Sequence, residues 1–388
     1  MDVVRKDVVV VGLGAFGSAA LWRLAERGVA AAGIERYGIG HNLGSSHGQT
    51  RLFRIACQEH AGLPAIAQKS LDLWTRLGEQ AGERLVLQTG CLNIGAPDSR
   101  PVAGTLAAAA AAGVPVSAIG PGELAPRQPQ YAGLGPGEVG VWDPSGGVCF
   151  PERNVRAHAD AARRLGAEIY PNTMALSIEA GPAGVTVLTP TIEFRAAQVI
   201  VAAGAWLGKL VPGLSLAPRR TLQYWFRPRN PASDDFTLAR FPAFIWQRSN
   251  GDHLWGHGSD TGFGIKIGPG GLERSRIDPD EVDRYIHPGS DIDPVTASVA
   301  SAFPGLDPRP ARVITCMITH SPDGQFIIGR PGGDPRVVVA GGDSGHGFKH
   351  SAGIGELLAQ TVTGEQPYCD TSFLEPARFA RAAASPEQ

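Results

Sequence analysis

The apolar and polar positions at the start of the chain follow the order strand, glycine turn, helix, strand. Residues 8–11 are apolar throughout, as in a parallel strand that is buried on both faces. A helix is predicted from about Ser18, and Gly28 is a normal stop residue for it. A second apolar strand follows and ends at Glu35. This order predicts a βαβ unit at the beginning of the chain.

Helical patterns return at several later points. The pattern at 64–80 is amphipathic and has Pro64 at its start, which predicts a helix. The alanine-rich run at 102–113 favours a short helix, because alanine has the highest helix propensity. Two further helices are predicted at 153–166 and from about Ser351. Apolar runs that are typical of strands occur at 167–172, 184–189, 191–206, 309–319, 325–329 and 336–342.

The pattern changes between residues 218 and 263, where short aromatic runs are separated by turn residues and suggest an antiparallel sheet. The predicted fold class is α/β with an α+β insert. A Rossmann-like domain would be assembled from the separated segments 1–85, 148–217 and 305–388. An inserted substrate domain, built on the antiparallel sheet, would comprise 86–147 and 218–304.

The glycine turn carries the first chemical signal. Gly12, Gly14 and Gly17 form G-x-G-x-x-G between a strand and a helix. Such glycines permit a tight turn and let a pyrophosphate approach the helix N-terminus. Glu35, at the end of the next strand, is placed to accept hydrogen bonds from a ribose. The context predicts a dinucleotide site; the alternative is a turn that only packs a helix against a strand.

Two further segments favour FAD over NAD. The apolar strand within 198–206 ends in Ala203 and Gly204 and resembles the second dinucleotide-domain strand of many flavoproteins. Residues 341–347, "GGDSGHG", return another glycine turn to the cofactor, for which a nicotinamide dehydrogenase has no need. This turn lies between a strand and a helix, where free backbone N–H groups favour an anion.

Composition excludes several partner classes. The net charge is only -2, so no global field favours nucleic acid or an anionic membrane. No stretch approaches the roughly 20 apolar residues that a bilayer span needs, and we expect a cytoplasmic protein. The cysteines are odd in number, scattered and never spaced C-x-x-C, which is typical neither of a disulfide framework nor of a zinc site. We expect no metal.

Several segments together resemble the monomeric sarcosine oxidase family, which includes N-methyltryptophan oxidase and other secondary amine oxidases. The motifs occur in that family's order and spacing, and the resemblance covers essentially the whole chain. They are "GSSHGQTRLFR" at 44–54, "GIKIG" at 264–268, "CMIT" at 316–319, "SPDGQFIIG" at 321–329 and "SGHGFKHSAGIGE" at 344–356.

The resemblance implies an oxidase in which FAD accepts electrons from a C–N bond beside a carboxylate and O2 is reduced to hydrogen peroxide. It also implies a monomer that acts on a small secondary amino acid. The implied cofactor-binding residues are Gly12, Gly14, Ala15, Phe16, Gly17, Glu35, Arg36, Ser46, Arg51, Ala203, Gly204, Cys316, Gly345, His346, Gly347, Phe348 and Lys349.

Two residues have specific implied roles at the flavin. Cys316 would carry the flavin through a covalent thioether; the alternative is a small buried residue in a strand. Lys266 would lie near flavin N5, through a water, and activate oxygen. A cation about 4 Å from forming superoxide contributes roughly 4 kcal/mol at an effective dielectric of 20, or roughly 10³-fold in rate. A solvated lysine at a strand edge is the alternative.

The remaining implied catalytic residues lie in the 44–54 segment and at the C-terminal turn. Arg54 and Lys349 would clamp the substrate carboxylate, for which a planar guanidinium fork and a second positive charge are suited. Arg51 would stack near the flavin, with Thr50 and His47 close to it. A surface arginine pair is the alternative for Arg51 and Arg54.

Three positions depart from sarcosine oxidase at the substrate end. Gly270 stands where the family often has a histidine, and Ile318 replaces a pocket tyrosine. A second tyrosine is replaced by either Leu254 or Trp255, where the alignment slips by one residue. A site without these polar groups is expected to accept larger and less polar side chains than sarcosine offers.

The sequence therefore predicts an FAD-dependent oxidase of N-methyl and other secondary amino acids. Sarcosine oxidation would give glycine, formaldehyde and hydrogen peroxide. Alternatives are an oxidase of N-methyltryptophan, pipecolate or D-amino acid type. Less favoured are an NAD-dependent dehydrogenase and a non-catalytic FAD-binding protein.

Overall fold

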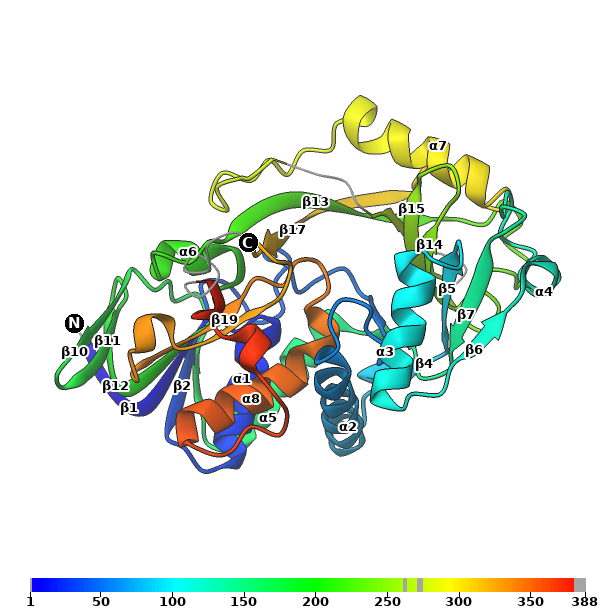
Figure 1. Ribbon diagram of the computed structural model, residues 1–388. Coiled ribbons are helices and arrows are strands. Elements are labelled where there is room, and N and C mark those ends of the chain that lie inside the picture. The colour runs from blue at the N-terminus through cyan, green and yellow to red at the C-terminus, as the bar shows by residue number, and fades with distance from the viewer. Residues whose placement is uncertain (1, 261–263, 271–274, 380–388) are drawn as a thin grey trace, which may run out of the picture.

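Three β-sheets and the helices packed against them make up residues 2–260, 264–270 and 275–379, the part of the chain that the computed structural model describes (Figure 1). The first sheet is mixed. Its strands, in spatial order, are β10 (Ser177–Gly181), β11 (Gly184–Leu188), β12 (Ile192–Val201), β1 (Asp2–Val11), β2 (Ala31–Ile34) and β9 (Glu168–Tyr170), with β19 (Val337–Gly341) paired to β12 and β18 (Ile327–Gly329) paired to β19. β1 pairs in parallel with both β12 and β2, and the predicted Rossmann-like arrangement is confirmed.

Strand β1 is buried on both faces at its C-terminal end. Val8 and Val10 belong to an apolar core shared with helices, whereas Val9 and Val11 belong to a second core on the opposite face. The continuous apolar pattern of this strand is explained by these two cores, because neither face meets solvent there. The strand begins earlier than the apolar run, at Asp2, where pairing with β12 starts.

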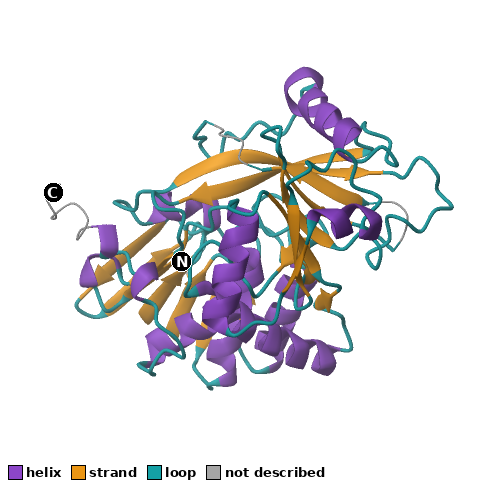
Figure 2. Cartoon of the chain, turned by 45° about the vertical axis from the view of Figure 1, so that its right-hand side comes forward, coloured by secondary structure: helices purple, strands orange, loops and turns teal. Residues whose placement is uncertain are grey.

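Helices group on one side of the first sheet, as Figure 2 shows. They are α1 (Ala15–Glu26), α5 (Pro151–Arg164), α8 (Ser351–Thr363) and α2 (Leu63–Ala81). α1 and α8 approach so closely that a Cβ added to Gly355 would lie 2.5 Å from the Cβ of Ala19. The helices expected at 64–80, 153–166 and from Ser351 are confirmed, and α1 begins directly after Gly14 rather than at Ser18.

The second sheet carries the aromatic runs. Its strands, in spatial order, are β17 (Arg312–His320), β13 (Ala217–Phe226), β16 (Ile265–Pro269), β15 (His253–His257), β14 (Ala243–Gln247), β5 (Cys91–Gly95), β7 (Val139–Asp143) and β6 (Ser117–Ile119). All neighbours are antiparallel except β14 and β5, which are parallel. One face packs its Phe and Trp side chains against α7 (Asp293–Ala302). α3 (Thr105–Ala112), α4 (Pro121–Arg127) and α6 (Leu207–Leu210) complete the helices.

Strand β17 belongs to the second sheet, because it pairs with β13 from Ala217↔His320 to Trp225↔Arg312. In Figure 1 these two long strands arch above the first sheet. Neighbouring residues of β17 point to opposite faces, so Cys316 and Met317 face different sides. The division into domains, in which 305–388 belongs to the nucleotide-binding domain, stays a prediction.

A small third sheet, absent from the sequence prediction, joins segments of both regions. It consists of β3 (Arg51–Phe53), β8 (Gly147–Cys149) and β4 (Val86–Gln88) in antiparallel pairing. One-turn helices occur at Arg100–Gly104, Gly204–Trp206, Pro288–Ile292, Pro331–Gly333, Phe348–His350 and Ser372–Leu374. Among the described residues, no helix combines the length and apolar character of a membrane span, and no His, Cys, Asp and Glu cluster suited to a metal is found.

Candidate active site

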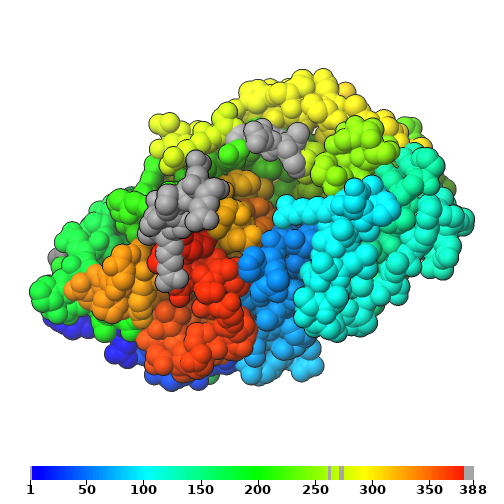
Figure 3. All heavy atoms as spheres, viewed as in Figure 1, coloured from blue at the N-terminus to red at the C-terminus, as the bar shows by residue number. Residues whose placement is uncertain are grey.

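A cavity of about 1070 Å³ lies between the two large sheets. Figure 3 shows the yellow and green segments of the second sheet and α7 overhanging the C-terminal segments, with a recess between them. Its walls are the loops that follow β1, β2, β12 and β19, together with the lower face of β13, β15 and β17. The carboxyl ends of parallel strands are where ligands bind in open α/β sheets, which makes this cavity the candidate active site.

The glycine turn forms one end of the cavity. Gly12 has φ +88, and a Cβ there would lie 2.7 Å from the carbonyl oxygen of Ala202, so only glycine is tolerated. Glu35 is buried and accepts hydrogen bonds from the backbone N–H of Leu13 at 2.8 Å and of Tyr37 at 3.0 Å. Its carboxylate therefore shapes the turn as well as lining the cavity.

The start of α1 lies against the 44–51 loop. The Ser46 hydroxyl accepts a hydrogen bond from the backbone N–H of Ala15 at 3.0 Å. A Cβ on Gly14 would meet only this hydroxyl, at 3.3 Å, and otherwise face the cavity. Gly17 faces inward instead, because a Cβ there would collide with the carbonyl oxygen of Gly12. Gly14 thus allows a ligand to approach, whereas Gly17 allows α1 to pack.

Ala203 and Gly204 follow β12 at the same part of the cavity, and Arg36 follows β2 nearby. Gly204 has φ +53, which a side chain would disfavour. The Arg36 guanidinium lies 5.3 Å from the ring centres of both Tyr37 and Trp206. This end of the cavity is therefore flat-walled and suited to a planar base.

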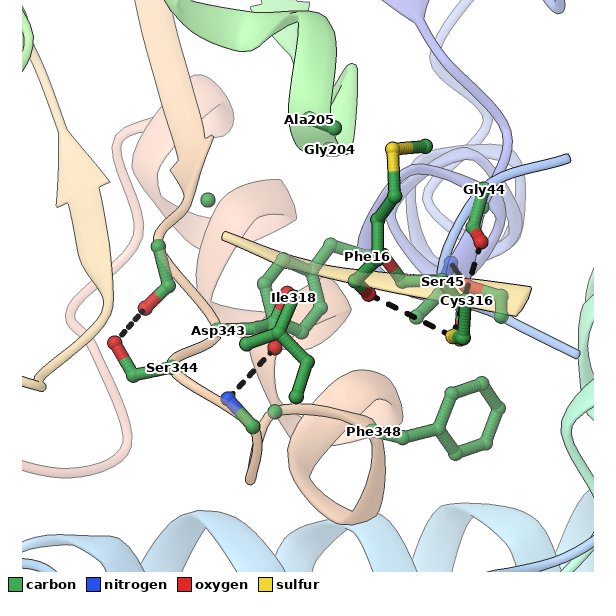
Figure 4. A pocket seen from close by; sticks show the side chains of 18 of the residues that line it. Phe16, Gly44, Ser45, Gly204, Ala205, Cys316, Ile318, Asp343, Ser344 and Phe348 are labelled. Atoms are coloured by element: carbon green, nitrogen blue, oxygen red, sulfur yellow. Dashed lines mark hydrogen bonds between the residues drawn. The ribbon is translucent and has the colours of Figure 1, made fainter. Parts of the chain in front are cut away.

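The opposite end of the cavity contains Cys316, whose sulfur points toward the carbonyl oxygens of Gly44 and Ser45 (Figure 4). Arg51 lies beside it, with Nη2 3.8 Å from the Cys316 sulfur. The same guanidinium donates to Ser45 O at 3.0 Å and to Gln223 Oε1 at 2.9 Å, which fixes it in place. The Cys316 sulfur therefore faces the cavity beside a guanidinium whose position is fixed.

The turn at 343–349 closes the cavity beneath Cys316 and Ile318 (Figure 4). Gly345 has φ +87, and Gly347 leaves room for Asp343. The His346 ring donates from Nε2 to Gly324 O at 2.9 Å. Phe348 stacks on Trp74 with ring centres 6.0 Å apart. Phe348 and Lys349 begin a one-turn helix that leads directly into α8.

Arg54 and Lys349 lie together in the cavity wall, as the clamp hypothesis requires. Both side chains are almost fully buried, with exposed fractions of 4% and 3%. Arg54 Nε and Nη1 have no hydrogen-bond partner among the described residues. The surface-arginine alternative is therefore wrong for Arg54, and its unpaired donors require an acceptor.

Glu59 is a candidate functional residue that the sequence did not indicate, and it lines the same cavity as Arg54 and Lys349. Its Oε1 lies 2.6 Å from Arg54 Nη2 and 3.5 Å from Lys349 Nζ. Burial alone would raise the pKa of Glu59, but Arg54 and Lys349 together lower it well below its ordinary value. The carboxylate is thus ionised, and two cations with one anion leave a single net positive charge. One substrate carboxylate would neutralise this charge. The only sign of Glu59 in the sequence was an acidic residue a few positions after Arg54.

Lys266 lies behind the cavity wall rather than in it. Its side chain is fully buried, so the solvated-edge alternative is wrong. Nζ donates to Gly48 O at 2.9 Å and to Thr50 O at 2.8 Å, and it lies 5.0 Å from the centre of the Trp225 ring. Burial, with the positive charge of Arg51, lowers the pKa of Lys266 well below its ordinary range.

Two histidines near Lys266 are neutral at pH 7. Burial lowers the pKa of His47 to about 3, and neither of its ring nitrogens has a hydrogen-bond partner among the described residues. Burial lowers the pKa of His257 to about 4. His257 donates from Nδ1 to Gly258 O at 2.7 Å, so its Nε2 accepts from the Thr50 hydroxyl at 2.8 Å. His257 therefore orients Thr50.

The structure decides which residue of β15 replaces the second pocket tyrosine. Leu254 packs in the core beneath α7, whereas Trp255 points to the cavity side. Trp255 pairs with Ile245 across β14 and lies over Gly268, where a Cβ would be 2.5 Å from its ring. With Ile318 in the same cavity, this wall is largely apolar. A strand's period of two separates neighbouring residues in this way.

These features fit FAD. The glycine turn, a buried acid at the end of β2 and a flat-walled end suit the dinucleotide half, and Cys316 lies at the other end of the same cavity. Pockets for drug-sized ligands span roughly 300–1,000 Å³, and this cavity is at the upper end of that range, with room for a substrate beside a cofactor.

Comparison with known proteins agrees with this geometry. The family described as FAD dependent oxidoreductase matches residues 7–361. The monomeric sarcosine oxidase of Streptomyces avermitilis is 31% identical over 97% of this chain and 99% of its own length. The N-methyl-L-tryptophan oxidase of Yersinia pestis is 28% identical over 96% of this chain and 99% of its own. The solved structure of NikD, an amino acid oxidase of nikkomycin biosynthesis, covers 96% of this chain and 97% of its own with a TM-score of 0.83 and 24% identity.

Proposed function

Since this chain belongs to the FAD-dependent oxidoreductase family and is a flavin-dependent amine oxidase, we propose that it oxidises N-methyl and other secondary amino acids with O2. For an N-methyl amino acid the products are the amino acid, formaldehyde and hydrogen peroxide. The observation that carries this proposal is the buried Arg54, Lys349 and Glu59 group, whose single excess positive charge faces the same cavity as Cys316.

In this proposal the chain's residues act mainly by placement. Arg54 offers its unpaired Nε and Nη1 to the substrate carboxylate, and Lys349 adds a second positive charge. The clamp fixes the carboxylate, so the adjacent C–N bond lies on the Cys316 side of the cavity. Bound FAD supplies the two-electron acceptor for that bond. Holding the reacting atoms in one orientation is worth several kcal/mol of barrier.

Cys316 is the proposed attachment residue for the cofactor. Its sulfur faces the cavity that fits FAD and lies 3.8 Å from Arg51 Nη2. Acid-precipitated protein should stay yellow and carry the mass of one flavin, and Cys316→Ala should release free FAD. Release of all flavin from the unmodified chain would remove the covalent proposal while leaving the oxidase proposal intact.

Lys266 is the proposed oxygen-activating residue. Its amine is held by the carbonyl groups of Gly48 and Thr50, directly behind the loop that carries Arg51. Its lowered pKa means that positive charge is costly there, and negative charge arriving in the cavity would raise that pKa again. Lys266 would therefore supply positive charge when oxygen is being reduced.

A second candidate within the same reaction class is an oxidase of N-methyl amino acids with large apolar side chains. Trp255 and Ile318 favour it, because they stand where the resemblance places hydrogen-bonding tyrosines, and Ile245, the cross-strand partner of Trp255, adds apolar surface. Gly270 lines the same cavity without a side chain, and a Cβ there would make only ordinary contacts, the nearest at 3.4 Å from His253. Apolar substrate surface that is buried against this wall contributes about 25 cal/mol per Å² to the binding free energy.

The decisive experiment is anaerobic bleaching of flavin absorbance with a panel of amines. The panel contains sarcosine, N-methyltryptophan, N-methylleucine, pipecolate and D-amino acids. We expect bleaching by N-methyl compounds, faster for the large apolar ones, and loss of bleaching in Arg54→Met. Bleaching by primary D-amino acids alone would overturn the substrate class, and no bleaching by any amine would favour a non-catalytic FAD-binding protein.

We also propose a monomeric, cytoplasmic enzyme whose partners are small molecules, without nucleic acid or membrane. The relatives named monomeric sarcosine oxidase support the oligomeric state, and the near-zero net charge supports the absence of polyanionic partners. Light scattering across a range of protein concentrations tests the first point.

A further inference from the structure

Residues 275–287 form a strap that leaves the second sheet and crosses to the first. Apart from an isolated bridge between Arg276 and Arg219, it contains no regular strand or helix. Its base is tied to β13, because Arg220 donates to Asp283 O at 2.7 Å and to Tyr285 O at 2.6 Å. The strap therefore has one fixed side on the second sheet.

The other side of the strap contacts the region of the first sheet through Asp280, Asp278 and Arg284, which donates to Leu43 O at 2.7 Å. Asp280 makes the largest number of these contacts. Asp280 accepts hydrogen bonds from Arg36 Nη1 at 2.6 Å, Trp206 Nε1 at 2.8 Å and Lys209 Nζ at 2.5 Å. Asp278 adds a second contact to Lys209 at 2.6 Å. All three partners of Asp280 belong to loops or short helices that follow strands of the first sheet, so Asp280 joins the two halves of the molecule.

This junction lies at the dinucleotide end of the cavity. Asp280, Arg36, Trp206 and Lys209 all line it, near Glu35. Asp280 also fixes the plane of the Arg36 guanidinium between the Tyr37 and Trp206 rings. Glu35 is the position that accepts from the ribose in dinucleotide-binding folds, which assigns this end to the adenosine half of FAD.

The ion pairs of Asp280 hold the strap in place, but each is weak enough to break reversibly. The side chains of Arg36, Lys209 and Asp280 remain 33%, 43% and 36% exposed. Ion pairs at this exposure contribute at most about 1 kcal/mol each and are screened by salt. A ligand that covers them would exclude water and strengthen them, so strap closure and ligand binding are coupled.

We propose that Asp280 is a cofactor-positioning residue, which closes the strap over the adenosine half of FAD through Arg36, Trp206 and Lys209. FAD would enter and leave by separation of Asp280 from these three partners. The flavin half, held by the 44–51 loop and the 343–349 turn, would be bound independently of Asp280, because the strap meets the chain beside that loop through a different residue, Arg284, which donates to Leu43 O at 2.7 Å. The proposal rests on FAD as the cofactor but not on the identity of the amine.

The test measures binding of cofactor fragments in the Cys316→Ala chain, where the flavin is exchangeable. Flavin fluorescence gives the affinity for FAD and for FMN, which lacks the adenosine half, and competition gives the affinity for ADP, which lacks the flavin half. We expect Asp280→Asn to lower the affinity for FAD and for ADP by about 10-fold, and the affinity for FMN by less than about twofold. A tenfold loss of affinity corresponds to about 1.4 kcal/mol of binding free energy.

Asp283→Asn is the matched control, because Asp283 lies in the same strap but its carboxylate faces His287 at 2.6 Å. We expect it to leave all three affinities unchanged. Raising the salt concentration should speed FAD release from the parent and have less effect in Asp280→Asn. If Asp280→Asn lowered the affinity for FMN as much as the affinity for FAD, the variant would have lost structure in general and the proposal would be wrong. Unchanged affinities for FAD and ADP in Asp280→Asn would also overturn the proposal. Because no amine is present, failure of the substrate proposal leaves these outcomes unaffected.

Discussion

At the scale of single residues, charge balance decides what the cavity binds. Glu59 shares its carboxylate between Arg54 and Lys349, so the buried group carries one excess positive charge rather than two. Burying a cation without a partner costs several kcal/mol of folding free energy. In the ligand-free protein, the Glu59 carboxylate reduces this cost for Arg54 and Lys349. The same carboxylate competes with the substrate for Arg54.

Glu59→Gln separates these two effects. We expect acetate, a minimal carboxylate ligand, to bind about 10-fold more tightly, because it becomes the only anion beside Arg54 and Lys349. We also expect a less stable ligand-free protein, by about 3 kcal/mol, since two buried cations lose their counter-ion. Titration of the flavin spectrum with acetate and urea unfolding measure the two quantities. Glu83→Gln, at an exposed ion pair, is the control, and an unchanged acetate affinity contradicts the assigned charge balance.

Lys266 presents two roles that one substitution distinguishes. If it activates oxygen, Lys266→Met should slow reoxidation of the reduced enzyme by O2 by roughly 10³-fold, while anaerobic reduction by the amine changes little. If it only holds the carbonyl groups of Gly48 and Thr50, both half-reactions should slow together. Stopped-flow absorbance measures each half-reaction separately. Lys69→Met provides the control, because Lys69 is half-buried on α2 against the Tyr368 ring and does not line the cavity.

At the scale of elements, the 44–51 loop is shaped by helix α5. Glu152, in the first turn of α5, accepts from the backbone N–H of Gly48 at 2.6 Å and of Gln49 at 3.0 Å. These bonds hold Gln49 at φ 68, a conformation that non-glycine residues seldom adopt. A Cβ on Gly48 would collide with Gln223. The loop that carries Arg51 and Thr50 is thus fixed from outside the cavity.

Glu152→Gln should therefore make the 44–51 loop less rigid, although Glu152 itself belongs to α5. We expect a loss of about 2 kcal/mol, the worth of charge-assisted hydrogen bonds to one carboxylate. Urea unfolding of the FAD-loaded protein measures it, and near-ultraviolet and visible circular dichroism of the flavin should change because Arg51 moves. Arg153→Gln, the exposed neighbour on α5, should leave both unchanged. An unaltered flavin signal in Glu152→Gln would mean that Arg51 is positioned without this anchor.

The local sequence pattern predicted individual helices and strands better than it predicted which strands pair with one another. The glycine turn, the continuous strand at 8–11 and the helix at 64–80 were predictable because periodicity and glycine chemistry act within a few residues. The pairing of β17 with β13 was not, since it joins segments far apart in the sequence. Register likewise decided between Leu254 and Trp255, because a shift of one residue moves a side chain to the other face. Glu59 was missed because its partners, Arg54 and Lys349, meet only in the fold.

At the scale of the whole molecule, buried histidines make stability depend steeply on pH. Burial lowers the pKa of His47 and His158 to about 3 and of His257 and His346 to about 4, whereas an unfolded histidine titrates near its ordinary value of 6.5. Between pH 6.5 and 4 the unfolded chain therefore binds protons that the folded chain does not. Stability is fully present above pH 6.5 and is lost as the pH falls through this window.

One carboxyl acts in the opposite direction. Burial raises the pKa of Asp343 to about 6, so between its ordinary value of 3.8 and pH 6 the folded state holds a proton that the unfolded state has released. This contribution stabilises the fold as the pH falls, but one such group opposes these four histidines and His350, whose pKa burial also lowers well below its ordinary value. Each uncompensated proton changes the unfolding free energy by about 1.4 kcal/mol per pH unit, so the net slope should approach roughly 5 kcal/mol per pH unit near pH 5.

Urea unfolding of the FAD-loaded protein between pH 8 and pH 4.5 measures this slope. We expect a nearly constant unfolding free energy from pH 8 to 7 and a steep fall below pH 6.5. His158→Gln isolates one group, because His158 lies in the helical core between Ser18 and Trp74 and away from the cavity. It should reduce the slope by about one proton, or about 1.4 kcal/mol per pH unit. A flat profile down to pH 5 would show that the buried histidines are hydrated in the folded state.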